Sequence, residues 1–130
     1  MKPEWTSFAT AKVPRYTSYP TAVEFGPAVD AQSAREWAGN TPATVPISAY
    51  VHVPFCEKLC WYCGCHTTVP NGYDRIARYV SSLHCEIDLW AEALGRHGGV
   101  GHLHFGGGSP NALSPDDFFA IAEHLRRALS

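Results

Sequence analysis

Apolar positions follow the chain in a strand–helix–strand–helix order. Ile47–Val53 alternates and carries β-branched residues, which predicts a strand. Apolar residues recur at steps of three and four through Gly72–Leu94, which predicts the longest helix. Val100–Phe105 predicts a second strand, and residues 115–129, with Ser114 as N-cap, predict a last helix. This order is typical of α/β proteins with a parallel sheet.

The patterning is weaker before the first strand. Asp30 can cap a short helix that runs through about Ala38. Pro14–Pro27 is rich in Pro, Tyr, Thr and Ser and has neither a helical nor a strand period, so we expect an extended arm. We therefore divide the chain into residues 1–45, an N-terminal arm with a short helix, and residues 46–130, with two β/α units.

Length and charge narrow the possible classes of protein. A (β/α) barrel needs roughly 200 residues or more, so the 130 residues here predict the first, incomplete part of a barrel and a fragment of a longer enzyme. The net charge of −2 offers no broad attraction to nucleic acid or to a membrane surface. No apolar run approaches the length of a membrane span, and the N-terminus lacks an apolar signal core. We expect a cytoplasmic protein.

Four of the five cysteines lie in one loop directly after the first predicted strand. Cys56, Cys60 and Cys63 have the spacing Cys-x3-Cys-x2-Cys, and Cys65 follows two residues later. Soft sulfur donors gathered in this way suit an iron–sulfur cluster or zinc. Structural zinc sites usually combine two separate ligand pairs, so the single dense loop favours the cluster, with a zinc-binding module as the alternative. Cys85 lies in the long helix, where we interpret it as a small buried hydrophobe.

The second predicted strand leads straight into the run Gly106–Gly108, followed by Ser109. Backbone without side chains can approach a ligand closely and offer it N–H and C=O groups. A glycine run alone is more often a tight turn. Because both loops follow parallel strands, they should meet at the edge of the sheet where α/β barrels place their active sites.

The cysteine spacing, with an aromatic residue before the third cysteine, resembles the cluster loop of the radical S-adenosylmethionine (radical SAM) enzymes. The added Cys65 and the segments Tyr50–Phe55 and Pro14–Thr21 narrow the resemblance to the oxygen-independent coproporphyrinogen III oxidases. It extends from about Pro14 to the end of the chain. It implies an α/β fold: the N-terminal part of a partial (β/α) barrel, preceded by an extended arm.

The resemblance also implies roles for individual residues. In the family, three cysteines hold a [4Fe-4S] cluster whose fourth iron binds S-adenosylmethionine, and Cys56, Cys60 and Cys63 match these ligands. Cys65 matches a cysteine that the oxidase needs although it is not a ligand, with a plain free thiol as the alternative. Arg15 is a candidate partner for a substrate propionate, since guanidinium pairs bidentately with carboxylate.

Other positions match residues around the cofactor. Two of them match contacts of the cluster-bound S-adenosylmethionine: Tyr50 and Gly107. Three match positions around a second molecule of it, although the family usually has phenylalanine and threonine at the first and last of them: Tyr62, Gly108 and Ser109. His52 matches a residue near the cofactor, with a packing role at the strand end as the alternative.

The implied activity is the oxygen-independent oxidative decarboxylation of two propionates of coproporphyrinogen III to vinyl groups, which gives protoporphyrinogen IX in haem biosynthesis. A 5′-deoxyadenosyl radical would start it, with electrons from an unidentified donor, in a monomeric enzyme without nucleic-acid or membrane partners. The related haem chaperones are an alternative, but they lack the fourth cysteine and the arm at Pro14–Thr21. A third reading is that these 130 residues alone are catalytically incompetent.

Overall fold

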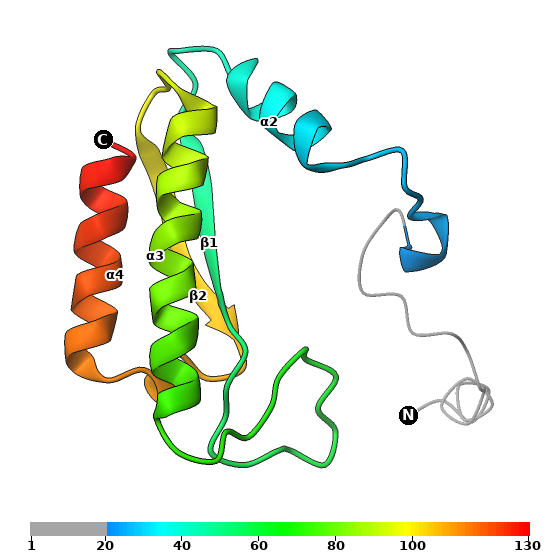
Figure 1. Cartoon of the computed structure of the whole chain (residues 1–130), viewed down its shortest axis with the longest axis vertical. Coiled ribbons are helices and arrows are strands. Elements are labelled where there is room, and N and C mark those ends of the chain that lie inside the picture. Colours follow the sequence, from blue (N-terminus) through cyan, green and yellow to red (C-terminus); the bar gives the residue numbers. More distant parts are fainter. Residues whose placement is uncertain (1–20) are drawn as a thin grey trace, which may run out of the picture. The chain divides into compact units, whose positions relative to one another are not determined.

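The computed structural model describes residues 21–130, and Arg15 and residues 14–20 of the predicted arm lie outside them. Ala31–Ser130 form one compact unit, and the segment before it contains the short 3-10 helix η2 (Ala22–Glu24). The compact unit has an α/β order of elements (Figure 1), with these bounds: α2 (Ala31–Gly39), β1 (Ile47–Val53), α3 (Asp74–Leu94), β2 (Val100–Gly107), η3 (Pro110–Ala112) and α4 (Pro115–Ala128).

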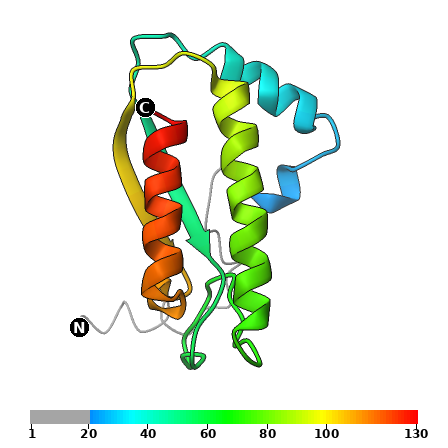
Figure 2. The same cartoon turned by 60° about the vertical axis from the view of Figure 1, so that its left-hand side comes forward.

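The two strands form a parallel sheet, as the sequence predicts. Val51 pairs with Phe105, and Val53 pairs with Gly107. β2 is therefore two residues longer than predicted, because the first two glycines of the run continue the ladder opposite β1. Helices α3 and α4 lie side by side against one face of the sheet (Figures 1 and 2).

The core lies between that face of the sheet and the two helices. Val53 and Ile121 have no exposed surface. The helical periodicity is confirmed by the buried residues of α3: Ile76, Val80, Leu83 and Ile87. Trp90, three residues after Ile87, is only partly covered, since 43% of its surface is exposed. Among the helices that the structure describes, none has both the length and the apolar character needed to cross a membrane.

The interpretation of Cys85 as a buried hydrophobe is wrong, because its side chain is exposed. An α-helix turns by about 100° per residue, so Cys85 lies on the side of α3 away from its buried neighbour Leu83. Its position two residues from the apolar stripe excludes it from the core.

Polar contacts join two residues to α4: Tyr73, directly before α3, and His84 of α3. At the start of α4, the Asp117 N–H donates to Oγ of Ser114 (3.1 Å), which confirms the predicted N-cap, and the Tyr73 hydroxyl donates to the Asp117 carboxylate. Further along, Nδ1 of His84 lies 2.7 Å from Nδ1 of His124. His84 is half-buried at this contact.

We expect Ile121→Ala to lower the free energy of unfolding by about 2–4 kcal/mol, because it removes a fully buried side chain and leaves a cavity. Phe119→Ala is the matched control on the same helix, since Phe119 is 70% exposed, and it should change the free energy by less than about 1 kcal/mol. Urea unfolding measures both. Equal losses would contradict the assignment of the buried face of α4.

Candidate metal and cofactor site

The two predicted functional loops are joined by backbone hydrogen bonds at the carboxyl end of the sheet. The Gly108 N–H donates to the Val53 carbonyl (2.8 Å), and the Ser109 N–H donates to the Phe55 carbonyl (2.7 Å). The parallel pairing thus continues beyond both strands into the loops. This places the glycine run directly against the start of the cysteine loop, as expected from the parallel order.

The base of the cysteine loop is closed by a second set of backbone contacts. Phe55 forms an isolated parallel bridge with Thr68. The Cys56 N–H donates to the Thr68 carbonyl (3.0 Å), and the Thr68 N–H donates to the Pro54 carbonyl (2.9 Å). The residues from 57 to 67 therefore form a loop whose two ends are fixed beside each other, next to the glycine run.

The cysteines divide between the base and the tip of this loop. Cys56 is half-buried at the base, whereas Cys60, Cys63 and Cys65 are exposed, and none of them forms a disulfide. Within the described part of the chain, no three His, Cys, Asp or Glu side chains are gathered as a ready metal site. The ligand assignment therefore stays a prediction.

The donor set nevertheless fits an iron–sulfur cluster. Three thiols on one loop are the soft ligands that such a cluster requires. One of them, Cys56, is held at the fixed base, and the exposed Cys60 and Cys63 belong to one turn, in which the Cys63 N–H donates to the Cys60 carbonyl (3.0 Å). Since the described residues do not gather these sulfurs into one group, binding a cluster would require the exposed tip to approach the base.

The glycine run lies so close to β1 that side chains are excluded from it. Gly107 has a φ of +102°, and a Cβ there would lie 2.8 Å from the ring of His52. A Cβ on Gly108 would lie 2.4 Å from the Phe55 carbonyl oxygen and 2.9 Å from Sγ of Cys56. Both positions therefore require glycine. A ligand beside Cys56 would therefore meet the backbone groups of this run.

His52 connects the cysteine loop to Tyr50. Its Nε2 lies 2.9 Å from the carbonyl oxygen of His66, and since a carbonyl only accepts, Nε2 carries the proton. In the neutral ring its Nδ1 is then an acceptor for the Tyr50 hydroxyl at 3.3 Å. The Tyr50 ring also stacks on His104, with ring centres 5.7 Å apart. Tyr50, Gly107 and His52, three residues predicted near the cofactor, thus lie together.

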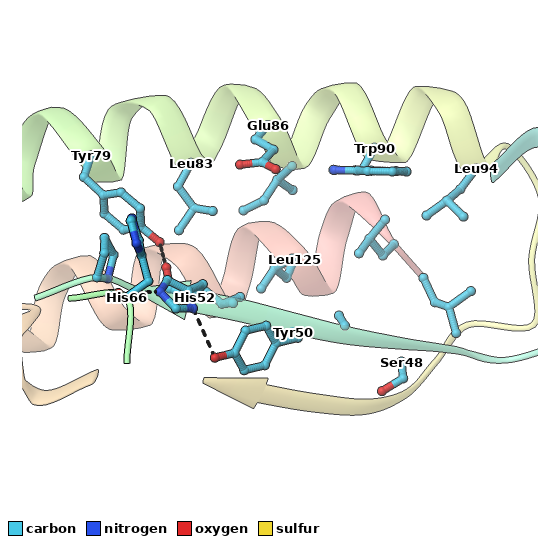
Figure 3. A pocket seen from close by; sticks show the side chains of 16 residues that line it. Ser48, Tyr50, His52, His66, Tyr79, Leu83, Glu86, Trp90, Leu94 and Leu125 are labelled. Carbon is cyan, nitrogen blue, oxygen red and sulfur yellow. Dashed lines mark hydrogen bonds between the residues drawn. The ribbon is translucent and has the colours of Figure 1, made fainter. Parts of the chain in front are cut away.

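An apolar groove of about 800 Å³ runs between β1 and α3 (Figure 3). On its α3 side, Tyr79 donates its hydroxyl proton to the His52 carbonyl (2.5 Å). Burial raises the pKa of Tyr79, and the nearby Glu86 carboxylate adds to the increase. The hydroxyl therefore stays protonated at neutral pH and serves as a donor that holds the end of β1 against α3.

The remaining predicted residues occupy different surroundings. Ser109 lies in the joined base, through its hydrogen bond to Phe55. Tyr62 is 87% exposed and belongs to the tip, together with the fully exposed Trp61. The structure therefore places Gly108 and Ser109 in the base and Tyr62 in the tip, although all three are predicted around one cofactor molecule.

Three residues that the sequence analysis did not single out contribute to the site. Tyr79 binds the His52 carbonyl, His66 accepts from the His52 ring, and Thr67 donates its hydroxyl proton to Cys56. Tyr79 is visible in the sequence only as one apolar position of a helix. The positions of His66 and Thr67 depend on how the end of the cysteine loop folds back on its start, which no spacing rule reveals.

Comparison with known proteins gives a consistent set of relatives. The chain is 46% identical over 122 residues to the oxygen-independent coproporphyrinogen III oxidase of Bradyrhizobium diazoefficiens, which covers 94% of this chain and 27% of that protein. For the enzyme of the same name from Escherichia coli, the identity is 40% over 114 residues, covering 87% and 24%. No protein-family model matches the chain.

The solved structure of coproporphyrinogen III oxidase from Escherichia coli, described as a radical SAM enzyme, matches with a TM-score of 0.76 at 38% identity. The match covers 88% of this chain and 26% of that one. The chain therefore spans about a quarter of the length of the relatives it matches. Over this region, the likeness to the oxidases predicted from the sequence is confirmed.

We expect Gly108→Ala to lower the free energy of unfolding by about 1–3 kcal/mol, because the added Cβ forces apart the joined loops. Gly101→Ala in β2 is the matched control, since its Cβ would approach Pro46 no closer than 3.4 Å. Chemical unfolding of the two variants checks the difference. A Gly108→Ala variant as stable as Gly101→Ala would contradict the close approach.

Proposed function

This chain is a relative of the oxygen-independent coproporphyrinogen III oxidases, and we propose that it carries the part of such an enzyme that binds an iron–sulfur cluster and S-adenosylmethionine. The observation that supports this most is the joining of the two loops. Hydrogen bonds from Gly108 and Ser109 hold a side-chain-free backbone beside Cys56. A thiol donor and open backbone groups thus share one edge of a parallel sheet, where α/β enzymes place their sites.

For the whole protein, we propose the reaction of these relatives, the oxidative decarboxylation of two propionates of coproporphyrinogen III to vinyl groups. The cluster and S-adenosylmethionine, when bound, supply the radical chemistry for this reaction. The chain's own residues would bind and orient both groups. The electron donor and the cytoplasmic location stay predictions.

Within the described residues, the roles follow from position. Cys56 would be the first cluster ligand because it is held at the fixed base. Cys60 and Cys63 would complete the set from the exposed tip. Gly107 and Gly108 would let the cofactor approach the backbone closely. This role is supported by the lack of room for a side chain at either position.

Tyr50 and His52 would form the side of the cofactor site on β1. The His66 carbonyl fixes the His52 ring, so its Nδ1 accepts the Tyr50 proton and directs the hydroxyl. The stacking of the Tyr50 ring on His104 restrains Tyr50 from its face. Tyr50 would therefore meet the cofactor as a rigid group.

The other predicted roles remain open to test. Cys65 would be a cysteine that catalysis needs outside the ligand set, and Arg15 would bind a substrate propionate. A second S-adenosylmethionine near Tyr62, Gly108 and Ser109 would require the tip to fold toward the base. The same tip movement would bring Cys60 and Cys63 to Cys56, so loading the cluster and forming this second site are linked.

Anaerobic iron–sulfur reconstitution of the 130-residue chain tests the proposal. We expect about four iron atoms per chain with matching sulfide and a visible charge-transfer band. Cys56→Ser and Cys60→Ser should each lose most of the iron. Cys85→Ser is the matched control, since Cys85 lies exposed on α3 outside the loop, and it should keep full iron content.

Zinc content is measured on the same samples. One zinc per chain without uptake of iron would contradict the proposed function and indicate a structural zinc site. An equal loss of iron in Cys85→Ser would also contradict it, because the iron would then not depend on the loop.

A further inference from the structure

We propose that Thr67 is a positioning residue for the cluster: its hydroxyl holds Cys56 through a hydrogen bond to the sulfur and makes the cluster easier to reduce. This inference rests on the proposed function, since it assigns a role toward the same cluster. It concerns a residue that lies outside the cysteine spacing and outside the glycine run.

The contact itself is specific. Oγ1 of Thr67 donates to Sγ of Cys56 at 3.3 Å, a distance suited to a sulfur acceptor because sulfur is larger than oxygen. Both residues are partly buried. Of the three predicted ligands, Cys56 alone lies in the fixed base of the loop, so its hydroxyl partner does not depend on the arrangement of the tip.

Backbone contacts set the position of Thr67. The next residue, Thr68, exchanges hydrogen bonds with the segment around Cys56: it donates to Pro54 and accepts from the Cys56 N–H. These two bonds fix the chain immediately beside Thr67 against the chain immediately beside Cys56. We therefore expect the hydroxyl–sulfur contact to persist when Cys60 and Cys63 move to bind the cluster.

Gly108 of the glycine run lies directly against the contact between Thr67 and Cys56. A Cβ on Gly108 would lie 2.5 Å from Oγ1 of Thr67 and 2.9 Å from Sγ of Cys56. The hydrogen bond thus lies in a narrow space between the two loops, where the competition from water is reduced. A hydrogen bond in such surroundings is electrostatically stronger than one in bulk water.

The chemical consequence follows from charge. Reduction adds one electron to the cluster, and a donor to a ligand sulfur stabilises the added negative charge. Hydrogen bonds to the sulfurs are among the factors that set the reduction potentials of iron–sulfur clusters. Without the Thr67 hydroxyl, the midpoint potential should therefore become more negative. The hydroxyl proton stays on Oγ1 throughout.

The test compares Thr67→Val with Thr67→Ser in the reconstituted 130-residue chain. Valine keeps the shape of threonine and removes the hydroxyl, whereas serine keeps the hydroxyl. Thr68→Val is the matched control, because it makes the same side-chain change at the next residue, whose hydrogen bonds to Pro54 and Cys56 come from its backbone and are kept. The readouts are iron content and the midpoint potential from a redox titration followed by electron paramagnetic resonance.

We expect a more negative potential in Thr67→Val, with Thr67→Ser and Thr68→Val close to the wild type. Loss of iron in Thr67→Val alone, rescued in Thr67→Ser, would support the role of the hydroxyl in holding Cys56. Full iron content with an unchanged potential in Thr67→Val would overturn the inference and leave the proposed function standing. Equal loss of iron in the valine and serine variants would also overturn it. A wild-type chain that takes up no iron would overturn both.

Discussion

The site depends on two backbone hydrogen bonds that continue the sheet beyond its strands. They run from the amides of Gly108 and Ser109 to the carbonyls of Val53 and Phe55. Because these amides cannot donate unless the two chains lie at sheet spacing, no side chain fits between them at Gly108. The hydrogen bonding, the glycine requirement and the half-buried position of Cys56 are thus consequences of one constraint.

The same constraint divides the cysteine loop into a hydrogen-bonded base and an exposed tip. The base is paired with the glycine run on one side and with Thr68 on the other. The tip presents three thiols and two aromatic side chains to solvent. Such a division suits a bound cluster, since the base can be formed before loading and the tip can then fold over the metal. The energy needed to order the tip would come from the metal–thiolate bonds.

The sequence was sufficient to predict the order of the elements and the parallel sheet, because the period of the apolar positions changes clearly between strand and helix. It gave the wrong burial for Cys85, which is exposed although it lies only two residues after the buried Leu83. A shift of two residues moves a side chain to the other side of the helix. It also placed the end of β2 too early, since glycine has a low strand propensity although Gly107 pairs with Val53. The roles of His66 and Thr67 depend on the closure of the loop, which is a tertiary contact.

Amide hydrogen exchange of the chain with and without the reconstituted cluster tests this account most directly. We predict slow exchange at the amides of Cys56, Thr68, Gly108 and Ser109 even without metal. The amides of Trp61 and Tyr62 in the tip should exchange rapidly and become protected only after loading. Rapid exchange at the base amides in the metal-free chain would contradict the claim that the base of the site is formed before the cluster binds.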